Sequence, residues 1–184
     1  MSLVAGPIPY QTPGMIAPEQ AFQATASGDV TAYFYGSTAS FSERVGLLVN
    51  GVQQGSWGLE NHSSSFGQAF NLGTVTAGDT LVFALMVADT GYTLYSDARL
   101  NPDGINHVYS TSFPGAVSNG VAIPAGTFVG FEDSLESFSD LNYNDETFVF
   151  TTTTPEGSSL LLTGLGILAG GFGAWRRKSI QHAV

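Results

Sequence analysis

The sequence predicts an all-β fold, a two-sheet sandwich or a jelly roll, followed by a linker and one C-terminal transmembrane helix. Short β-rich apolar runs recur through residues 19–152, and turn residues separate them. No part of that region keeps the period of an amphipathic helix. An uncharged run at 158–175 is followed at once by a basic cluster, as at the end of a membrane span. A chain of 184 residues has room for one such domain and a tail.

Nine runs are predicted to form strands because they are apolar or alternate apolar and polar residues between turn signals. Asn50-Gly51 stands between two of these runs and predicts a type I′ hairpin, since both residues tolerate a positive φ. Glycine, proline, asparagine and aspartate mark further breaks at 77–79, 101–104 and 124–126. The predicted strands are residues 30–35, 45–49, 52–57, 66–72, 81–87, 92–95, 107–113, 127–131 and 147–152.

The first residues are expected to precede the β-domain. Residues 1–18 are rich in proline, and the small residues at 4–6 would suit a signal-peptide cleavage site just before Pro7. We therefore expect a signal-peptide stump and extended lead-in at 1–18, a β-sandwich domain at 19–152, and a linker with a C-terminal signal at 153–184.

The domain is strongly acidic. The whole chain has a formal net charge of −10, and three of its five cations lie at 176–178. Residues 1–154 hold Arg44 and Arg99 against fourteen acids, since the fifteenth is Glu156, so their formal charge is −12. This charge balance argues against nucleic-acid binding, which needs cationic side chains to neutralise phosphates. It is compatible with the binding of divalent cations or with a solvated extracellular surface. The chain has no cysteine, so disulfides and thiol chemistry are excluded.

Oxygen-bearing side chains are concentrated between the last two predicted strands. No lysine or arginine lies near them in sequence, and a hard cation would relieve the repulsion of the carboxylates. Calcium prefers such ligands, so the segment predicts a Ca²⁺ site, although a solvated acidic turn remains the alternative. The spacing is not that of an EF-hand. The predicted ligands are Glu132, Asp133, Asp140, Asn142, Asn144 and Asp145.

The same segment resembles a known bacterial family. Phe131-Glu132-Asp133, a short loop, Asn142-Tyr143-Asn144-Asp145 and Phe148-Val149-Phe150 resemble the closing segment of the bacterial domain-of-unknown-function family 4114. In this chain Asn142 replaces the family's usual first aspartate, and the spacer at 134–139 has no glycine. The resemblance covers about residues 81–152. It implies a β-rich, calcium-binding surface module of secreted bacterial proteins and no known reaction.

Other polar and aromatic residues are weaker candidates. Asp97, Asn101, Asp103, Asn106 and His107 form a second donor group, which is as readily a turn as a ligand set. The three histidines are too scattered to predict a zinc triad. The candidates for stacking on sugars, which are also candidates for core packing, are Tyr33, Tyr35, Trp57, Tyr92 and Tyr95.

The tail has the length and composition of a membrane signal. The uncharged residues 158–175 would span about 27 Å as a helix, near the thickness of a bilayer's hydrocarbon core. Pro155-Glu156-Gly157 precedes this run, and Arg176, Arg177 and Lys178 follow it. The arrangement resembles the PEP-CTERM sorting signal, with Gly157 in place of the family's second proline. An ordinary C-terminal tail anchor is the alternative.

The resemblance implies processing by an exosortase-like membrane protease of a Gram-negative bacterium. The protein would be exported, held transiently in the inner membrane, and then placed at the cell surface or in the extracellular matrix. We expect a calcium-stabilised β-domain for adhesion or glycan binding, with extracellular polysaccharide as a possible partner and no nucleic acid. A purely structural surface protein without a ligand is the first alternative, and a glycan-active enzyme is the second. An enzyme is not expected, because no catalytic motif stands in a convincing context.

Overall fold

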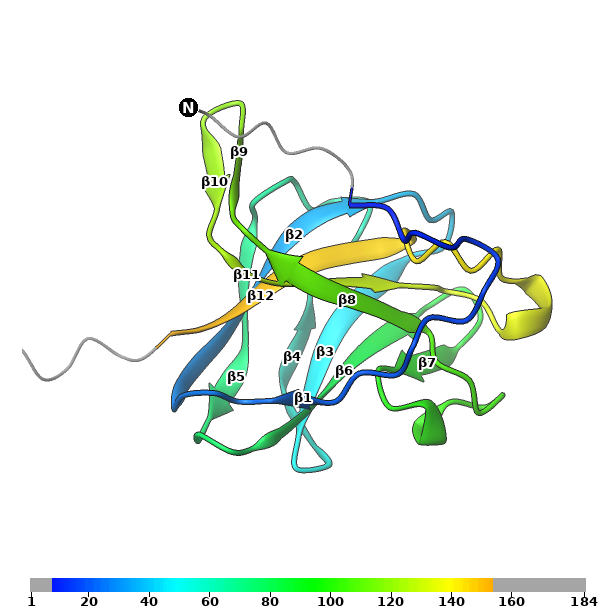
Figure 1. Cartoon of the computed structure of the whole chain (residues 1–184), viewed down its shortest axis with the longest axis horizontal. Coiled ribbons are helices and arrows are strands. Elements are labelled where there is room, and N and C mark those ends of the chain that lie inside the picture. The colour runs from blue at the N-terminus through cyan, green and yellow to red at the C-terminus, as the bar shows by residue number, and fades with distance from the viewer. Residues whose placement is uncertain (1–7, 154–184) are drawn as a thin grey trace, which may run out of the picture. The chain divides into compact units, whose positions relative to one another are not determined.

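The computed structural model describes residues 8–153, which are all-β. These residues belong to one compact unit that ends at Thr154. Two 3₁₀ turns, η1 (Ala98–Leu100) and η2 (Glu136–Phe138), interrupt the strands (Figure 1). The strands are β1 (Phe22–Gln23), β2 (Gly28–Ser37), β3 (Glu43–Val49), β4 (Val52–Gly58), β5 (Ala69–Val75), β6 (Thr80–Val87), β7 (Tyr92–Tyr95), β8 (Val108–Phe113), β9 (Ala116–Ser118), β10 (Val121–Ile123), β11 (Gly126–Phe131) and β12 (Glu146–Thr153).

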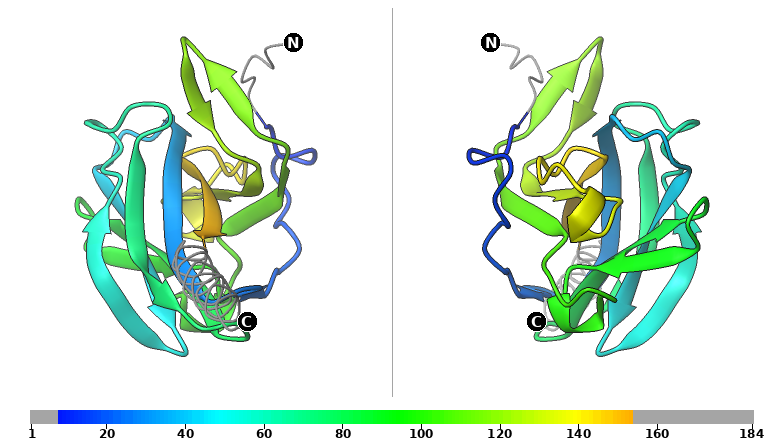
Figure 2. Two further views of the ribbon diagram at one scale, coloured as in Figure 1. Left: turned by 90° about the vertical axis from the view of Figure 1, so that its left-hand side faces the viewer. Right: turned by 90° about the vertical axis from the view of Figure 1, so that its right-hand side faces the viewer.

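The strands form two main antiparallel sheets. The first has the order β1-β6-β3-β4, and β7 pairs with the same edge of β6 as β1 does, farther along the strand. The second has the order β5-β2-β12-β11-β8. Figure 2 shows the two sheets as facing layers, with the β9–β10 hairpin extending beyond them. The last strand, β12, lies in the centre of the second sheet between β2 and β11.

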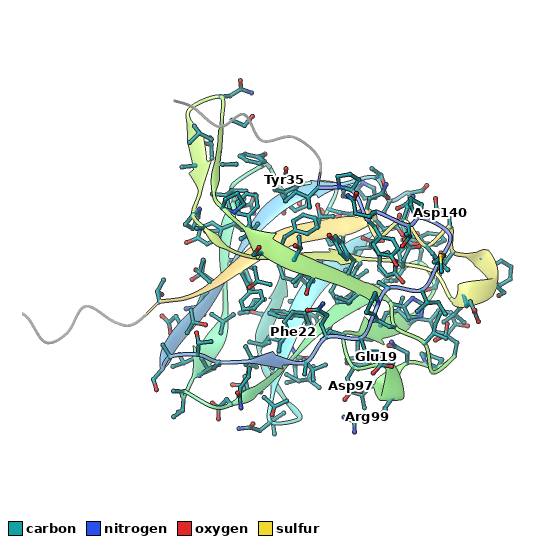
Figure 3. The ribbon with its side chains drawn as sticks, viewed as in Figure 1. Glu19, Phe22, Tyr35, Asp97, Arg99 and Asp140 are labelled. Carbon is teal, nitrogen blue, oxygen red and sulfur yellow. The ribbon has the colours of Figure 1, made fainter. Side chains whose placement is uncertain are left out.

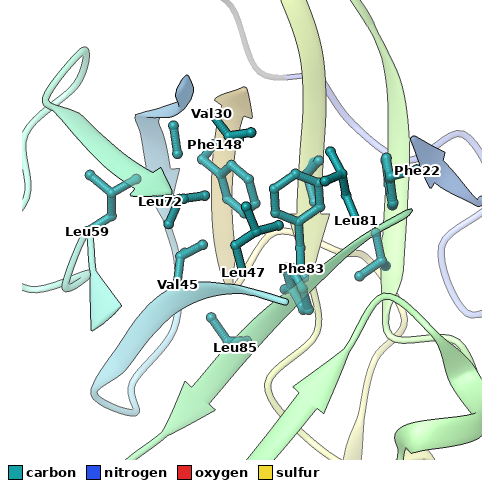
Figure 4. Packing of buried hydrophobic residues seen from close by; sticks show 14 of the residues in the cluster. Phe22, Val30, Val45, Leu47, Leu59, Leu72, Leu81, Phe83, Leu85 and Phe148 are labelled. Atoms are coloured by element: carbon teal, nitrogen blue, oxygen red, sulfur yellow. The ribbon is translucent and has the colours of Figure 1, made fainter. Parts of the chain in front are cut away.

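The main core fills the space between the sheets. Alternate residues of each strand point inward, so Val45 and Leu47 of β3 meet Phe148 of β12 (Figure 4). Val129 of β11 belongs to the same cluster. Phe83 of β6 is fully buried and packs against Phe148, with ring centroids 5.4 Å apart. Burying a side chain of this size contributes roughly 1.5–3 kcal/mol, so this cluster accounts for much of the cohesion of the two sheets.

A second apolar cluster covers the outer face of the second sheet. Phe128 of β11 and Val149 of β12 point away from the main core, and Ala116 and Ile123 of the β9–β10 hairpin pack with them. Residues 8–18 also lie on this side, and Tyr10 is buried against Tyr109, Leu141 and Tyr143. Burial on both faces explains why residues 128–131 of β11 are all apolar or glycine instead of alternating with polar residues.

The all-β prediction is confirmed, and each of the nine predicted runs overlaps a strand. The run at 66–72 begins three residues too early, since β5 begins at Ala69. The type I′ prediction is also confirmed, because Asn50 has φ 50° and Gly51 has φ 81° between β3 and β4. The sequence pattern does not predict β1, β9 or β10. It predicts an extended lead-in at residues 1–18, whereas Tyr10 and Ala17 are buried in the domain.

The predicted membrane helix lies outside the described residues, as do the sorting residues at 155–157 and 176–178. Within residues 8–153, no helix has the length and apolar character needed to cross a bilayer.

Candidate functional site

The loop between β11 and β12, residues 132–145, is folded back onto the end of the sandwich by Glu132. This side chain is 1% exposed, and its carboxylate accepts hydrogen bonds from the backbone N–H of Tyr143, from the Ser139 hydroxyl and, at 3.2 Å, from the N–H of Leu141. Burial raises the pKa of Glu132, and the bonds from Ser139 and Tyr143 oppose that rise. Glu132 therefore organises the loop, and its oxygens are largely occupied by that task.

The path of the loop depends on two backbone features, the left-handed conformations at Leu141 and Tyr143 and the close approach of the loop to Gly130. Leu141 and Tyr143 have φ of 51° and 58°, so the chain twice adopts the left-handed conformation around Asn142. A Cβ at Gly130 would overlap the carbonyl oxygen of Tyr143, so the glycine allows the returning loop to lie against β11. These local features direct successive side chains of 140–145 to different sides of the loop.

One side of this loop lines an acidic pocket of about 260 Å³. The N–H of Asp133 donates to Oδ2 of Asp145 at 3.0 Å, and the Ser134 hydroxyl donates to Oδ1 of Asp133 at 2.7 Å. The N–H of Asp145 donates to the carbonyl of Phe131 at 3.1 Å, which fixes Asp145 at the beginning of β12. Asp140 lines the same pocket and is exposed at its edge.

Two further carboxylates lie behind this pocket, one from each sheet. Glu43 begins β3 in phase with Val45 and Leu47, and Glu146 begins β12 opposite Phe131, so both point into the interior. Both residues are 0% exposed, and none of their four carboxylate oxygens has a hydrogen-bond partner among residues 8–153. The N–H of Glu43 donates to Oδ1 of Asn61 at 2.9 Å, which holds its backbone in place. We call Glu43, Asp133, Asp145 and Glu146 the carboxylate cluster.

The electrostatics of this cluster are unfavourable when its carboxylates are ionised and no cation is bound. Burial raises the pKa of Glu43 to about 10, assisted by the neighbouring Asp133, Glu146 and Asp145 carboxyl groups. Burial also raises the pKa of Asp145 to about 7 and raises the pKa of Glu146 well above its usual range. Glu43 and Asp133 lie close enough to share a proton, but neither can donate when both are ionised. The cluster must therefore take up protons or a cation when the protein folds near neutral pH.

The structure separates the six predicted ligands into two groups. Glu132, Asp133, Asp140 and Asp145 line the acidic pocket. Asn142 and Asn144 line a different pocket, described below. Oδ1 of Asn142 accepts from the N–H of Asn144 at 3.1 Å, and Oδ1 of Asn144 accepts from the Thr38 hydroxyl at 2.5 Å.

Glu43 and Glu146 are not among the ligands predicted from the sequence. Their positions in the strand alternation could have identified them. Each carboxylate occupies an inward-facing position, and the next inward-facing residue of its strand is apolar.

The second donor group makes structural contacts. Asp97 caps η1 and pairs with the exposed Arg99 at 2.7 Å (Figure 3). Asn101 bonds to the backbone of Tyr95 and Ile105, and thereby closes its loop. Nε2 of the buried His107 lies 3.0 Å from Oδ2 of Asp103, which also accepts from the N–H of Glu136. This contact links the β7–β8 connection to the loop at residues 132–145, which we call the acidic loop.

The five aromatic candidates for sugar stacking do not lie on one strand or in one sheet. Tyr33 and Tyr35 belong to β2, Trp57 to β4, and Tyr92 and Tyr95 to β7. Tyr35 lines the same pocket as Asn142 and Asn144.

Among residues 8–153, no three side chains of histidine, cysteine, aspartate or glutamate are already placed so that they could hold a metal ion together. The carboxylates of the cluster would therefore have to move closer around an ion. Asp133 and Asp145 line the acidic pocket, whereas Glu43 and Glu146 are fully buried. No protein-family model and no curated protein matches the sequence.

Proposed function

We propose that this chain is a calcium-binding, non-catalytic β-module of an exported bacterial surface protein. The observation that carries the proposal is the pair of fully buried carboxylates, Glu43 and Glu146, whose oxygens have no partner among the described residues. Ionised carboxylates in such positions are costly unless they are paired or bind a metal. With Asp133 and Asp145 beside them, a divalent cation would replace mutual repulsion with attraction.

The donor set favours calcium over other metals. All four groups of the cluster offer oxygen, and the chain has no cysteine. Calcium accepts six to eight oxygen ligands in flexible geometry, with carboxylates, backbone carbonyls and water all suitable. Zinc prefers nitrogen and sulfur ligands, and the buried His107 is already engaged with Asp103. The bound ion would join β3 of one sheet to β12 and the acidic loop of the other.

The cellular role is proposed from the sequence pattern. Residues 155–178 resemble a PEP-CTERM signal, which supports export, transient anchoring in the inner membrane, and processing by an exosortase-like protease. The strongly acidic, cysteine-free domain is compatible with an extracellular matrix rich in calcium and polysaccharide. In that setting the ion would stabilise the module after export.

Calorimetric titration with calcium and parallel thermal melts test the metal site. Residues 1–154 should bind calcium saturably and melt at a higher temperature when it is present, because an ion that binds the native state shifts unfolding. Glu43→Gln and Glu146→Gln should each weaken calcium binding by about tenfold or more, a loss of about 1.4 kcal/mol. Glu136→Gln is the matched control, since Glu136 is exposed outside the cluster. No heat and no shift in melting temperature at millimolar calcium would refute the proposal.

A further inference from the structure

A larger pocket lies beside the acidic one, on the outer side of the second sheet. Its volume is about 560 Å³, within the range of roughly 300–1,000 Å³ typical of small-ligand sites. Part of its wall is formed by the half-buried rings of Tyr35 and Phe66, whose centroids are 5.7 Å apart in an edge-to-face arrangement. We call this cavity the aromatic pocket.

Polar groups complete the wall of the aromatic pocket. Asn142, Asn144 and Ser118 contribute amides and a hydroxyl, and Thr38 contributes a second hydroxyl. Oδ1 of Asn144 accepts from Thr38, but its amide NH₂ group has no partner within residues 8–153. The pocket therefore combines apolar ring surface with neutral hydrogen-bonding groups.

The absence of charged residues from the lining of the aromatic pocket indicates a neutral ligand. None of the residues that line the aromatic pocket is charged, although residues 1–154 carry a formal charge of −12. An anionic ligand would meet no compensating cation there and would be repelled by the surrounding acids, whereas a cationic ligand would find no carboxylate. A neutral saccharide fits both the aromatic surface and the neutral polar groups of the pocket. Its C–H face packs on aromatic rings, and its hydroxyls bond to amides and other hydroxyls.

The two pockets share one wall. Asp140 and Asp145 line the acidic pocket, while Asn142, Tyr143 and Asn144 between them line the aromatic pocket. The positive φ values of Leu141 and Tyr143 allow this division within a single short segment. Thr38 lines both pockets and is bonded to Asn144 through its N–H at 3.1 Å and its hydroxyl at 2.5 Å. Figure 3 labels Tyr35 of the aromatic pocket and Asp140 of the acidic pocket.

We propose that the aromatic pocket binds a neutral saccharide and that calcium in the acidic pocket strengthens this binding by ordering residues 140–145. The coupling rests on the calcium site proposed above. An ion that draws Asp133 and Asp145 together would fix the segment that positions Asn142 and Asn144. Coupling between two ligands is reciprocal, so the saccharide should raise calcium affinity by the same factor.

Calorimetry on the full chain, kept in a detergent without a sugar headgroup, tests the inference. The probes are neutral tetrasaccharides of glucose, mannose and galactose, with tetragalacturonate as the anionic control. At least one neutral probe should bind saturably in calcium, and its affinity should fall about fivefold or more in excess chelator, the lower end of typical allosteric coupling. The anionic probe should not bind.

Two variants on the β9–β10 hairpin provide a matched pair. Ser118→Tyr places a large ring in the aromatic pocket and should abolish saccharide binding without changing calcium affinity measured in the absence of sugar. Val117→Tyr is the control, because Val117 is 38% exposed on the neighbouring position and does not line the pocket. Equal saccharide binding by wild type and Ser118→Tyr would overturn the assignment of the pocket.

The outcomes separate this inference from the proposed function. Calcium binding without binding of any neutral probe would overturn the saccharide pocket and leave the calcium site standing. Saccharide binding with no calcium binding would refute the proposed function and the coupling, but would support the pocket. Equal saccharide affinity in calcium and in chelator would overturn the coupling alone.

Discussion

Glu43 of β3 and Glu146 of β12 belong to opposite sheets, and both side chains lie at the same end of the domain interior. The charge of Glu146 contributes to the raised pKa of Glu43. Neither side chain is exposed, and their four oxygens have no partner among residues 8–153. Two carboxylates in facing sheets would push the layers apart when ionised. An ion between them would instead hold the layers together, so the stability of this end of the domain should depend on pH and on metal.

The ion-free protein should become less stable as pH rises from 5 to 7. Folding raises the pKa of Asp145 from 3.8 to about 7 and that of Glu43 from 4.5 to about 10. In this window the folded state binds more protons than the unfolded state, so stability present at low pH is lost as pH rises. The slope for each proton is at most about 1.4 kcal/mol per pH unit. Urea denaturation in chelator at several pH values measures it, and stability that increases over this range would contradict the prediction.

Glu43→Gln should make the ion-free protein more stable at pH 7 by up to about 3.5 kcal/mol. The wild-type side chain must be protonated on folding at this pH, which costs about 1.4 kcal/mol for each unit between pH 7 and its unfolded pKa. Glutamine is neutral and has similar size. In calcium the order should reverse, with wild type the more stable protein. The denaturant midpoints of wild type and Glu43→Gln, measured with and without calcium, test this prediction. The control Glu136→Gln should have the wild-type midpoint in both conditions.

Tyr143→Phe should destabilise the domain by about 1–2 kcal/mol. The Tyr143 hydroxyl accepts from the N–H of Ala17 at 2.7 Å and donates to the carbonyl of Asn106 at 3.3 Å, so it joins residues 8–18 to the domain. Phenylalanine would leave the buried N–H of Ala17 without its partner. Thermal melts measure the loss. Tyr92→Phe, at a ring that is 41% exposed, should have little effect, and equal losses in both variants would contradict the assigned role.

Gly130→Ala should displace the acidic loop and weaken calcium binding. The new methyl group would overlap the carbonyl oxygen of Tyr143, and since this is backbone, the loop itself must shift. Overpacking of this kind costs about 1–3 kcal/mol. Gly36→Ala is the control on β2, because its nearest neighbour would be Oγ1 of Thr147 at 3.9 Å, an ordinary contact. Calorimetry and thermal melts should show weaker calcium binding and a lower melting temperature for Gly130→Ala than for Gly36→Ala. Wild-type calcium affinity in Gly130→Ala would count against a loop-dependent site.

Local sequence was sufficient for the elements with strong local signals. Alternation and turn residues predicted every strand of the two main sheets except β1, and Asn50-Gly51 predicted its hairpin, because period and turn chemistry act within a few residues. The same Asn-Gly signal occurs at Asn119-Gly120, where φ is 49° and 81°. It was not recognised because β9 and β10 have three residues each, too few to show a period.

By itself, the sequence also located the acidic segment at 132–145 and its shortage of nearby cations. Only the tertiary structure decided which carboxylates meet. Glu43 is some ninety residues from Asp133 in the chain, and only the facing of the two sheets brings them together. Conversely, Asn142 and Asn144 lie within three residues of Asp145 in sequence but line another pocket, because the left-handed turns at Leu141 and Tyr143 redirect them. Sheet packing and backbone handedness are non-local or conformational properties, and the spacing of residue types alone does not encode them.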